Sequence, residues 1–422
     1  MITDETYRFL SNRSYWLDPE HDNYRDRPKV NQQFNYGSSQ FQILKKENDA
    51  SGMQAMAVAP IKNGHVDTSQ VVIAYAGTNS GDWKDLETDL RTVGGAYESA
   101  IKMSQTPALH FLGGESQHAL RYYGQIQSAT DFASEIKSEY PNAEMTTTGH
   151  SLGEYTALYI AAENQWSNVG FNGPDPYQLL SPKAKKWVKE NPGMLMNYRN
   201  RGDKLIGNLM GNGTGAQVLI SMEMGLHLNP LDYHSLSNWR FDSKGRLIIP
   251  ENDFNGESIL QQKQNKIMQQ FSFKLEELKL LKHRLARSKG GLSSGEKNYL
   301  DDNGALAVVE MAKAEFALDT KKLIKIYRDG IEHAQTLWDE TLSSARNSGY
   351  LLSDYEIISE LESSGFTKRN IVTRPTDEYD EKMNQIQQMS VKFDQLIESI
   401  KDKIHELVAR DQELAVQLKN MS

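Results

Sequence analysis

A five-residue segment, Gly149-His150-Ser151-Leu152-Gly153, has the residue types and spacing of a turn that presents a nucleophile. Glycines two positions before and two positions after a serine allow the chain to turn sharply from a strand into a helix. The serine hydroxyl then projects from the carboxyl end of a sheet, and the next N–H group is free to meet an oxyanion. The segment therefore predicts a nucleophile elbow, with acyl transfer at Ser151 as its chemistry.

A serine nucleophile of this kind needs a histidine and a carboxylate as partners. An imidazole must accept the hydroxyl proton, and a carboxylate must fix the tautomer of that imidazole and stabilise it once charged. In serine hydrolases with such an elbow, the order along the chain is nucleophile, acid, histidine. After Ser151, the first part of the chain offers two histidines and three plausible acids: His227, His234, Asp175, Asp203 and Asp232.

Asp203 is the preferred acid and His234 the preferred base. Asp203 follows a predicted strand, 194–198, after a short loop, so that its side chain could reach the same sheet edge as Ser151. Asp232 lies only two residues from His234 and remains the alternative acid. His227 is the alternative base.

Two N–H groups are predicted to form an oxyanion hole. One belongs to Leu152, directly after the nucleophile, and the other is expected from a loop that follows an earlier strand. The apolar, β-branched run 71–76 is such a strand, and Gly77 ends it. Thr78 therefore lies where the second donor belongs.

The elements around these residues alternate between strands and helices up to about residue 255. The predicted strands are 71–76, 145–148, 169–171 and 194–198, and the predicted helices are 120–140 and 154–163. Such alternation indicates an α/β domain with a mostly parallel sheet that helices cover on both faces. Eleven of the twelve prolines lie at or before Pro250, which supports a domain boundary there.

The remaining chain, 256–422, reads as a domain of long helices, so that the predicted domains are 1–255 and 256–422. Apolar spacing predicts helices from residue 260 to about 285, over 306–342, over 354–361 and from 379 to 418. The last of them carries a heptad seam typical of a coiled coil. Its members are Tyr379, Met383, Ile386, Ser390, Phe393, Ile397, Ile400, Ile404, Leu407, Asp411, Leu414 and Leu418.

Composition excludes several other classes of function. The 422 residues carry a net charge of −9 without a basic stretch, which argues against a nucleic-acid partner. No cysteine occurs, so disulfides and cysteine-based zinc sites are excluded. No apolar run reaches the roughly 20 residues that cross a bilayer. The amino-terminal residues lack the basic and apolar segments of a Sec signal peptide.

Two segments resemble the class 3 lipases. AYAGTNSGDWKDLETDL, residues 74–90, is similar to the strand, oxyanion turn and Asp-Trp segment of that family, and TTTGHSLGEYTALYIAA, residues 146–162, is similar to its elbow and following helix. The likeness covers roughly residues 30–250 and implies an α/β-hydrolase fold that cleaves lipid carboxylic esters without metal or organic cofactor. It departs from the family at Ala76, where arginine is common. It implies Ser151 as nucleophile, His234 as general base and acid, and Asp203 as orienting acid.

The whole arrangement resembles the type VII secreted lipase effectors in which an LXG-like helical domain lies at the C-terminus. That resemblance implies export from a Gram-positive bacterium and small helical targeting proteins on residues 259–422. It also implies an immunity protein that blocks the lipase, and phospholipids of rival cells as substrate. Tyr350 and Asp354 match the Y-x-x-x-D pattern associated with that export system. Two alternatives stay open: a catalytically silent hydrolase fold on a coiled-coil scaffold, and an intracellular esterase with a helical oligomerisation domain.

Overall fold

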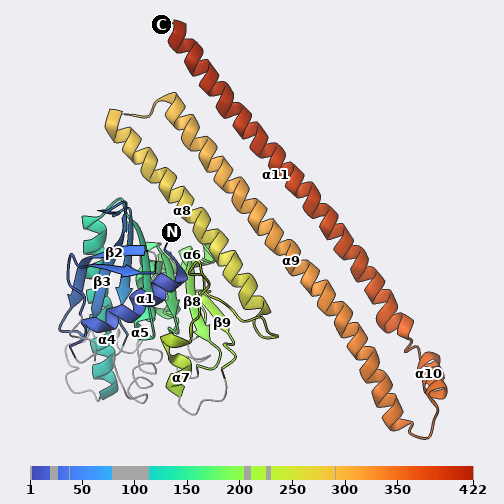
Figure 1. Cartoon of the computed structure of the whole chain (residues 1–422). Coiled ribbons are helices and arrows are strands. Elements are labelled where there is room, and N and C mark those ends of the chain that lie inside the picture. The colour runs from blue at the N-terminus through green and yellow to red at the C-terminus, as the bar shows by residue number, and fades with distance from the viewer. Residues whose placement is uncertain are drawn as a thin grey trace. The chain divides into compact units, whose positions relative to one another are not determined.

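The computed structural model describes residues 2–19, 27–37, 39–77, 114–203, 211–224, 230–289 and 291–421. The chain divides into two compact units, Met1–Phe273 and Lys274–Ser422. The first unit is a mostly parallel mixed sheet with helices, and the second is helical (Figure 1). An α/β unit followed by a helical unit is the combination that the sequence predicts.

The sheet is antiparallel on one side and parallel on the other. Its strand order is β1-β2-β3-β5-β6-β7-β8-β9, with β4 paired to β3. Pairing is antiparallel from β1 to β5 and parallel from β5 to β9. The strands are β1 Gln33–Tyr36, β2 Ser39–Asn48, β3 Gln54–Lys62, β4 His65–Val66, β5 Gln70–Tyr75, β6 Glu144–Gly149, β7 Ser167–Phe171, β8 Leu195–Asn200 and β9 Gln217–Ile220. The four predicted strands are β5 to β8, whereas the antiparallel strands and β9 were not predicted.

Helices cover both faces of this sheet (Figure 1). The side chains of β5 alternate between the two faces. Val72 and Ala74 pack in the core beneath α1, whereas Val71 and Ile73 pack against α4 and α5. A strand buried on both faces reads as a continuous apolar run, which is why 71–76 was predictable. The helices of this unit are α1 Asp4–Ser14, α4 Gly114–Glu139, α5 Leu152–Asn164, α6 Pro182–Glu190, α7 Pro230–His234 and the first part of α8 Gly256–Lys289, with short 3-10 turns at Tyr15–Leu17, Tyr177–Leu179 and Leu236–Asn238.

The first half of α8 belongs to the α/β unit. Lys266 pairs with Asp4, whose carboxylate is 1% exposed. Gln262 Nε2 donates to the Tyr198 hydroxyl at 3.2 Å, and Gln269 Nε2 donates to the carbonyl oxygen of Gly193 at 3.2 Å. These contacts explain why the division between units falls after residue 273 and not at the predicted residue 255, although α8 begins where a helix was expected.

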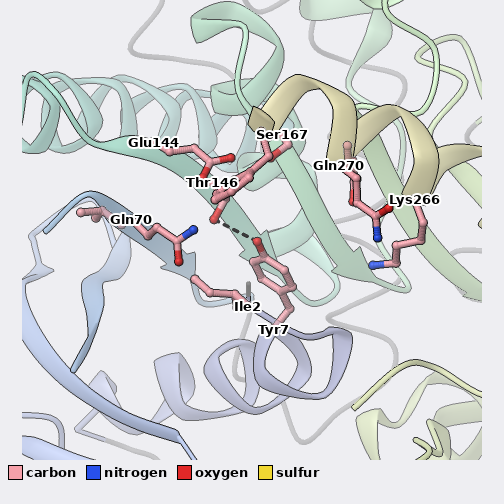
Figure 2. Close-up of a pocket in the computed structure, with 11 residues that line it drawn as sticks. Ile2, Tyr7, Gln70, Glu144, Thr146, Ser167, Lys266 and Gln270 are labelled. Atoms are coloured by element: carbon pink, nitrogen blue, oxygen red, sulfur yellow. Dashed lines mark hydrogen bonds between the residues drawn. The ribbon is translucent and has the colours of Figure 1, made fainter. Parts of the chain in front are cut away.

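A small pocket lies where α8 meets the amino-terminal ends of the parallel strands. Tyr7 on α1 points to β6, and its hydroxyl donates to Thr146 Oγ1 at 3.2 Å (Figure 2). Lys266 and Gln270 reach the same pocket from α8. It therefore lies at the sheet edge opposite to the carboxyl ends of the strands.

Two long antiparallel helices dominate the second unit. Phe316 stacks on Phe393 with ring centroids 4.0 Å apart, and Tyr327 meets Tyr379 at 5.6 Å. Capping boxes at Ser293 and Ser353 satisfy the first N–H groups of two helices. The elements are α9 Ser294–Ser348, α10 Asp354–Ser363, a π-helical turn at Arg369–Thr373 and α11 Arg374–Met421.

The predicted heptad seam lies along α11 and is covered over only part of its length. Ile386 and Ile397 are buried, at 8% and 3% exposure, whereas Ile400 and Leu407 are 37% and 58% exposed. The side chains of the last members, from Asp411 onwards, lie outside the described residues. Within the described ranges, no helix combines the length and the apolarity that crossing a membrane requires.

Candidate active site

Ser151 lies between the end of β6 and the start of α5, as an elbow requires. Its backbone has φ 59° and ψ −130°, a conformation that residues with a side chain rarely adopt. Such a backbone costs about 1 to 3 kcal/mol and persists only where surrounding structure enforces it. The side chain is 2% exposed, so the hydroxyl is held in a buried, strained turn.

Close packing explains why glycine flanks the serine on both sides. A Cβ atom at Gly149 would lie 2.3 Å from the carbonyl carbon of Gly153. A Cβ atom at Gly153 would lie 2.4 Å from the carbonyl oxygen of Tyr75, at the end of β5. The two glycines therefore allow helix α5 to begin directly against the ends of β5 and β6.

His234 and Asp203 form a buried hydrogen bond at the same edge of the sheet. Nδ1 of His234 donates to Oδ2 of Asp203 at 2.7 Å, and the two residues are 4% and 2% exposed. Because Nδ1 carries the proton in this bond, Nε2 of a neutral His234 keeps its lone pair and can act as a base. Asp203 reaches this position through a turn after β8, in which its N–H donates to the carbonyl oxygen of Asn200 at 3.0 Å.

Ser151 and His234, the predicted nucleophile and base, are not joined by a direct hydrogen bond in the part of the chain that the structure describes. The ring of His150, the residue before Ser151, has its centroid 4.5 Å from that of His234. Within the described residues, Ser151 Oγ and His234 Nε2 are both buried and have no hydrogen-bond partner. Catalytic hydrogen bonds are often long before substrate binds and shorten in the reacting complex.

The other predicted candidates take different positions. Asp175 accepts hydrogen bonds from the Thr214 hydroxyl at 2.7 Å and the Tyr177 N–H at 2.8 Å, so it shapes a loop. Asp232 lies on α7, but the bond from His234 goes to Asp203. His227 lies outside the described residues.

Only part of the predicted oxyanion hole can be placed. Leu152 is the first residue of α5, so its N–H has no partner within the helix. Gly77 approaches the elbow closely, since a Cβ atom there would lie 2.7 Å from the carbonyl oxygen of His150. Thr78 lies outside the described residues.

Glu154 is a buried carboxylic acid that sequence reasoning missed. Its side chain is fully buried and accepts a hydrogen bond from Asn168 Nδ2 at 3.3 Å. Gly170 on β7 leaves the space for it, because a Cβ atom there would overlap the carboxyl group at 1.6 Å. Burial raises the pKa of Glu154 well above its usual range, and burial likewise lowers the pKa of nearby Arg199. A glutamate in the first turn of a helix usually lies at the surface, so no local pattern predicted this burial.

No cluster of three or more histidine or carboxylate side chains suited to a metal ion occurs in the part of the chain that the structure describes. Comparisons with models of known protein families, with curated proteins and with solved structures found no match to this chain.

Proposed function

We propose that the protein is a carboxylic ester hydrolase of α/β-hydrolase fold that acts on lipids through Ser151, His234 and Asp203. The observation that carries this proposal is the strained backbone of Ser151 at a strand-to-helix turn, beside a buried histidine and carboxylate. Backbone strain concentrates at functional sites. The similarity of the two motifs to class 3 lipases supports lipid esters, of the phospholipase A type, as the substrate class.

In the proposed reaction, His234 Nε2 accepts the proton of the Ser151 hydroxyl as Oγ attacks the ester carbonyl carbon. Asp203 holds the imidazole in the tautomer that can accept this proton, and stabilises the imidazolium that results. The N–H groups of Leu152 and Thr78 bind the oxyanion. His234 then protonates the leaving alcohol, and water releases the acid from the acyl-enzyme by the reverse sequence of proton transfers.

Replacing Ser151 tests this proposal directly. Ser151→Ala should abolish labelling by a fluorophosphonate and fatty-acid release from phosphatidylglycerol vesicles, because only an activated serine reacts rapidly with such a probe. Ser237→Ala, which changes an exposed serine three residues from His234, is the matched control and should leave both unchanged. Equal labelling of wild type and Ser151→Ala would refute the mechanism. An unreactive wild-type protein would favour a catalytically silent fold instead.

We further propose that the chain is an antibacterial effector that is exported by a type VII system, with its helical part as the targeting domain. Apolar side chains left exposed on α9 and α11 support a role in binding small helical partners, among them Ile326 at 62% and Leu407 at 58% exposure. An immunity protein would then block the lipase in producing cells.

Export and helical partners can be tested independently of catalysis. The tagged chain should appear outside Gram-positive cells only when the type VII apparatus and the small helical proteins encoded by neighbouring genes are present. Ile326→Lys with Leu407→Lys should prevent co-purification of those proteins while leaving fluorophosphonate labelling unchanged. Secretion from cells without the apparatus would contradict the effector proposal and favour another route or an intracellular esterase.

A further inference from the structure

The loop that carries the histidine is held by side chains from the ends of three neighbouring strands. Helix α7 ends at His234, and the last carbonyl groups of a helix have no partner within it. Asn200 Nδ2, at the end of β8, donates to the carbonyl oxygen of Tyr233 at 3.0 Å. Asn172 Nδ2, after β7, and His150 Nε2, after β6, both donate to the carbonyl oxygen of His234 at 2.9 Å. The backbone of the base is thus fixed from the edge of the sheet.

The donor role of His150 follows from its other contacts. A carbonyl oxygen only accepts, so Nε2 of His150 must carry a proton in the bond to His234. Nδ1 lies 2.9 Å from the hydroxyl of Tyr15, which donates to it when the imidazole is neutral. Burial and the neighbouring His234 hold the pKa of His150 well below its usual range, and burial raises the pKa of Tyr15, so both stay uncharged. The carbonyl oxygen of His234 therefore fixes the tautomer of His150, and the hydroxyl of Tyr15 is the partner of its other ring nitrogen.

A neutral His150 also suits the chemistry proposed for its neighbour. The two rings are 4.5 Å apart by their centroids, and His234 becomes an imidazolium each time it accepts the serine proton. A second positive charge at that distance would oppose this protonation. The polar atoms of His150 are occupied by Tyr15 and by the carbonyl oxygen of His234, which leaves the serine proton to His234 alone.

We propose that His150 is a positioning residue that fixes the base against the nucleophile turn, with Tyr15 holding its other ring nitrogen. The inference rests on the hydrolase function proposed above. Because His150 is joined to Ser151 by a peptide bond and to the carbonyl oxygen of His234 by a hydrogen bond, it ties both reacting groups to one turn. Misplacing a catalytic group by about 1 Å can lower a rate by about a hundredfold.

Three variants of the full-length chain separate positioning from stability. His150→Leu removes the donor, His150→Gln keeps an N–H donor at similar reach, and Tyr7→Phe is the control. Tyr7→Phe deletes one buried hydroxyl bond, to Thr146, at the opposite edge of the sheet (Figure 2). The readouts are the rate of Ser151 labelling by a fluorophosphonate, kcat and KM for p-nitrophenyl butyrate, and near-ultraviolet circular dichroism as a check of folding.

We expect His150→Leu to be labelled about ten- to a hundredfold more slowly, with kcat lowered and KM nearly unchanged, because the base acts in the transition state. His150→Gln should recover most of the rate, and Tyr7→Phe should lose stability without losing rate. Wild-type labelling of His150→Leu, or equal losses in folded His150→Leu and His150→Gln, would overturn the proposal.

Should His150→Leu fail to fold, Tyr15→Phe decides the matter, because it removes the single oxygen that holds Nδ1 of His150 and so loosens the ring that holds His234. Slower labelling of Tyr15→Phe supports the proposal, and wild-type labelling overturns it. These outcomes presuppose that wild-type protein reacts and Ser151→Ala does not. Failure of that comparison would instead reject the hydrolase function on which the inference rests.

Discussion

Replacing Ser151 by glycine should reveal the strain in the elbow as a stability higher than a matched alanine-to-glycine control predicts. At φ 59° and ψ −130°, a residue with a Cβ atom is strained by about 1 to 3 kcal/mol, whereas glycine adopts this backbone freely. The suitable reference is Ser151→Ala and not the wild type. The hydroxyl oxygen of Ser151 is buried without a partner in the described residues, and its removal alters stability in both variants alike.

Two other contributions accompany an alanine-to-glycine step, and a control removes them. Glycine costs about 1 kcal/mol in backbone propensity, and the lost methyl group costs about 0.8 kcal/mol when it is buried. Ala157, fully buried in the regular part of α5, has both costs but no strain. Ala157→Gly should therefore destabilise by about 1 to 2 kcal/mol. The change in the free energy of unfolding from Ser151→Ala to Ser151→Gly should be more favourable, by about 1 to 3 kcal/mol, than the change from wild type to Ala157→Gly.

Urea unfolding followed by tryptophan fluorescence is a suitable assay. Five of the six tryptophans precede residue 274, so the signal reports mainly the α/β unit. Both Ser151 variants should be inactive, so stability and activity are separated. If Ser151→Gly is less stable than Ser151→Ala by as much as Ala157→Gly is less stable than wild type, the turn is not strained, and the main support for a nucleophile elbow is lost.

Two further predictions concern buried ionisable side chains. Glu154→Gln should become increasingly more stable than wild type as the pH rises from about 5 to about 7, by at most about 1.4 kcal/mol per pH unit. The reason is that burial raises the pKa of Glu154, so the folded protein keeps a proton that the unfolded chain releases above its ordinary pKa. If the difference between the urea midpoints of the two proteins stays constant across this pH range, Glu154 is ionised in the folded protein and the prediction is wrong. Lys266→Met should lower the free energy of unfolding by about 2 to 3 kcal/mol, because it leaves the buried carboxylate of Asp4 without its counter-charge. Lys279→Met, on the same helix but in a pair 63% and 38% exposed, should change it by less than about 1 kcal/mol, and equal effects of the two would argue against α8 as part of the α/β unit.

Local patterns were sufficient for the elements that bear the elbow. The run 71–76 and the segment 145–148 are strands because β-branched and apolar residues suit a sheet covered on both faces. The apolar spacing after residue 256 likewise predicted the long helices. Glycines at fixed distances from Ser151 encode a turn within five residues, so that no distant contact is needed to recognise it.

The antiparallel part of the sheet was missed for the opposite reason. Strands β1 and β2 carry polar residues on faces that are not buried, and β3, although buried, is rich in alanine, which strands disfavour. Their pairing depends on neighbours that periodicity does not identify. The first half of α8 was assigned to the helical domain because prolines end at Pro250 and its apolar spacing continues the helical pattern of the later chain. Only the hydrogen bonds of Gln262 and Gln269 and the ion pair of Lys266 show that this half of α8 packs on the α/β unit.

By itself, the sequence determined the strand-to-helix turn at Ser151, the parallel strands around it and the helical character of the second part. The partners within the site were decided by the tertiary structure. It joined His234 to Asp203 across 31 residues and Tyr15 to His150 across 135. A turn is specified by φ and ψ preferences and by the space that a few adjacent residues need, so local sequence contains it. A hydrogen bond between distant residues depends on how the intervening chain returns to the same sheet edge, and no local pattern records that path.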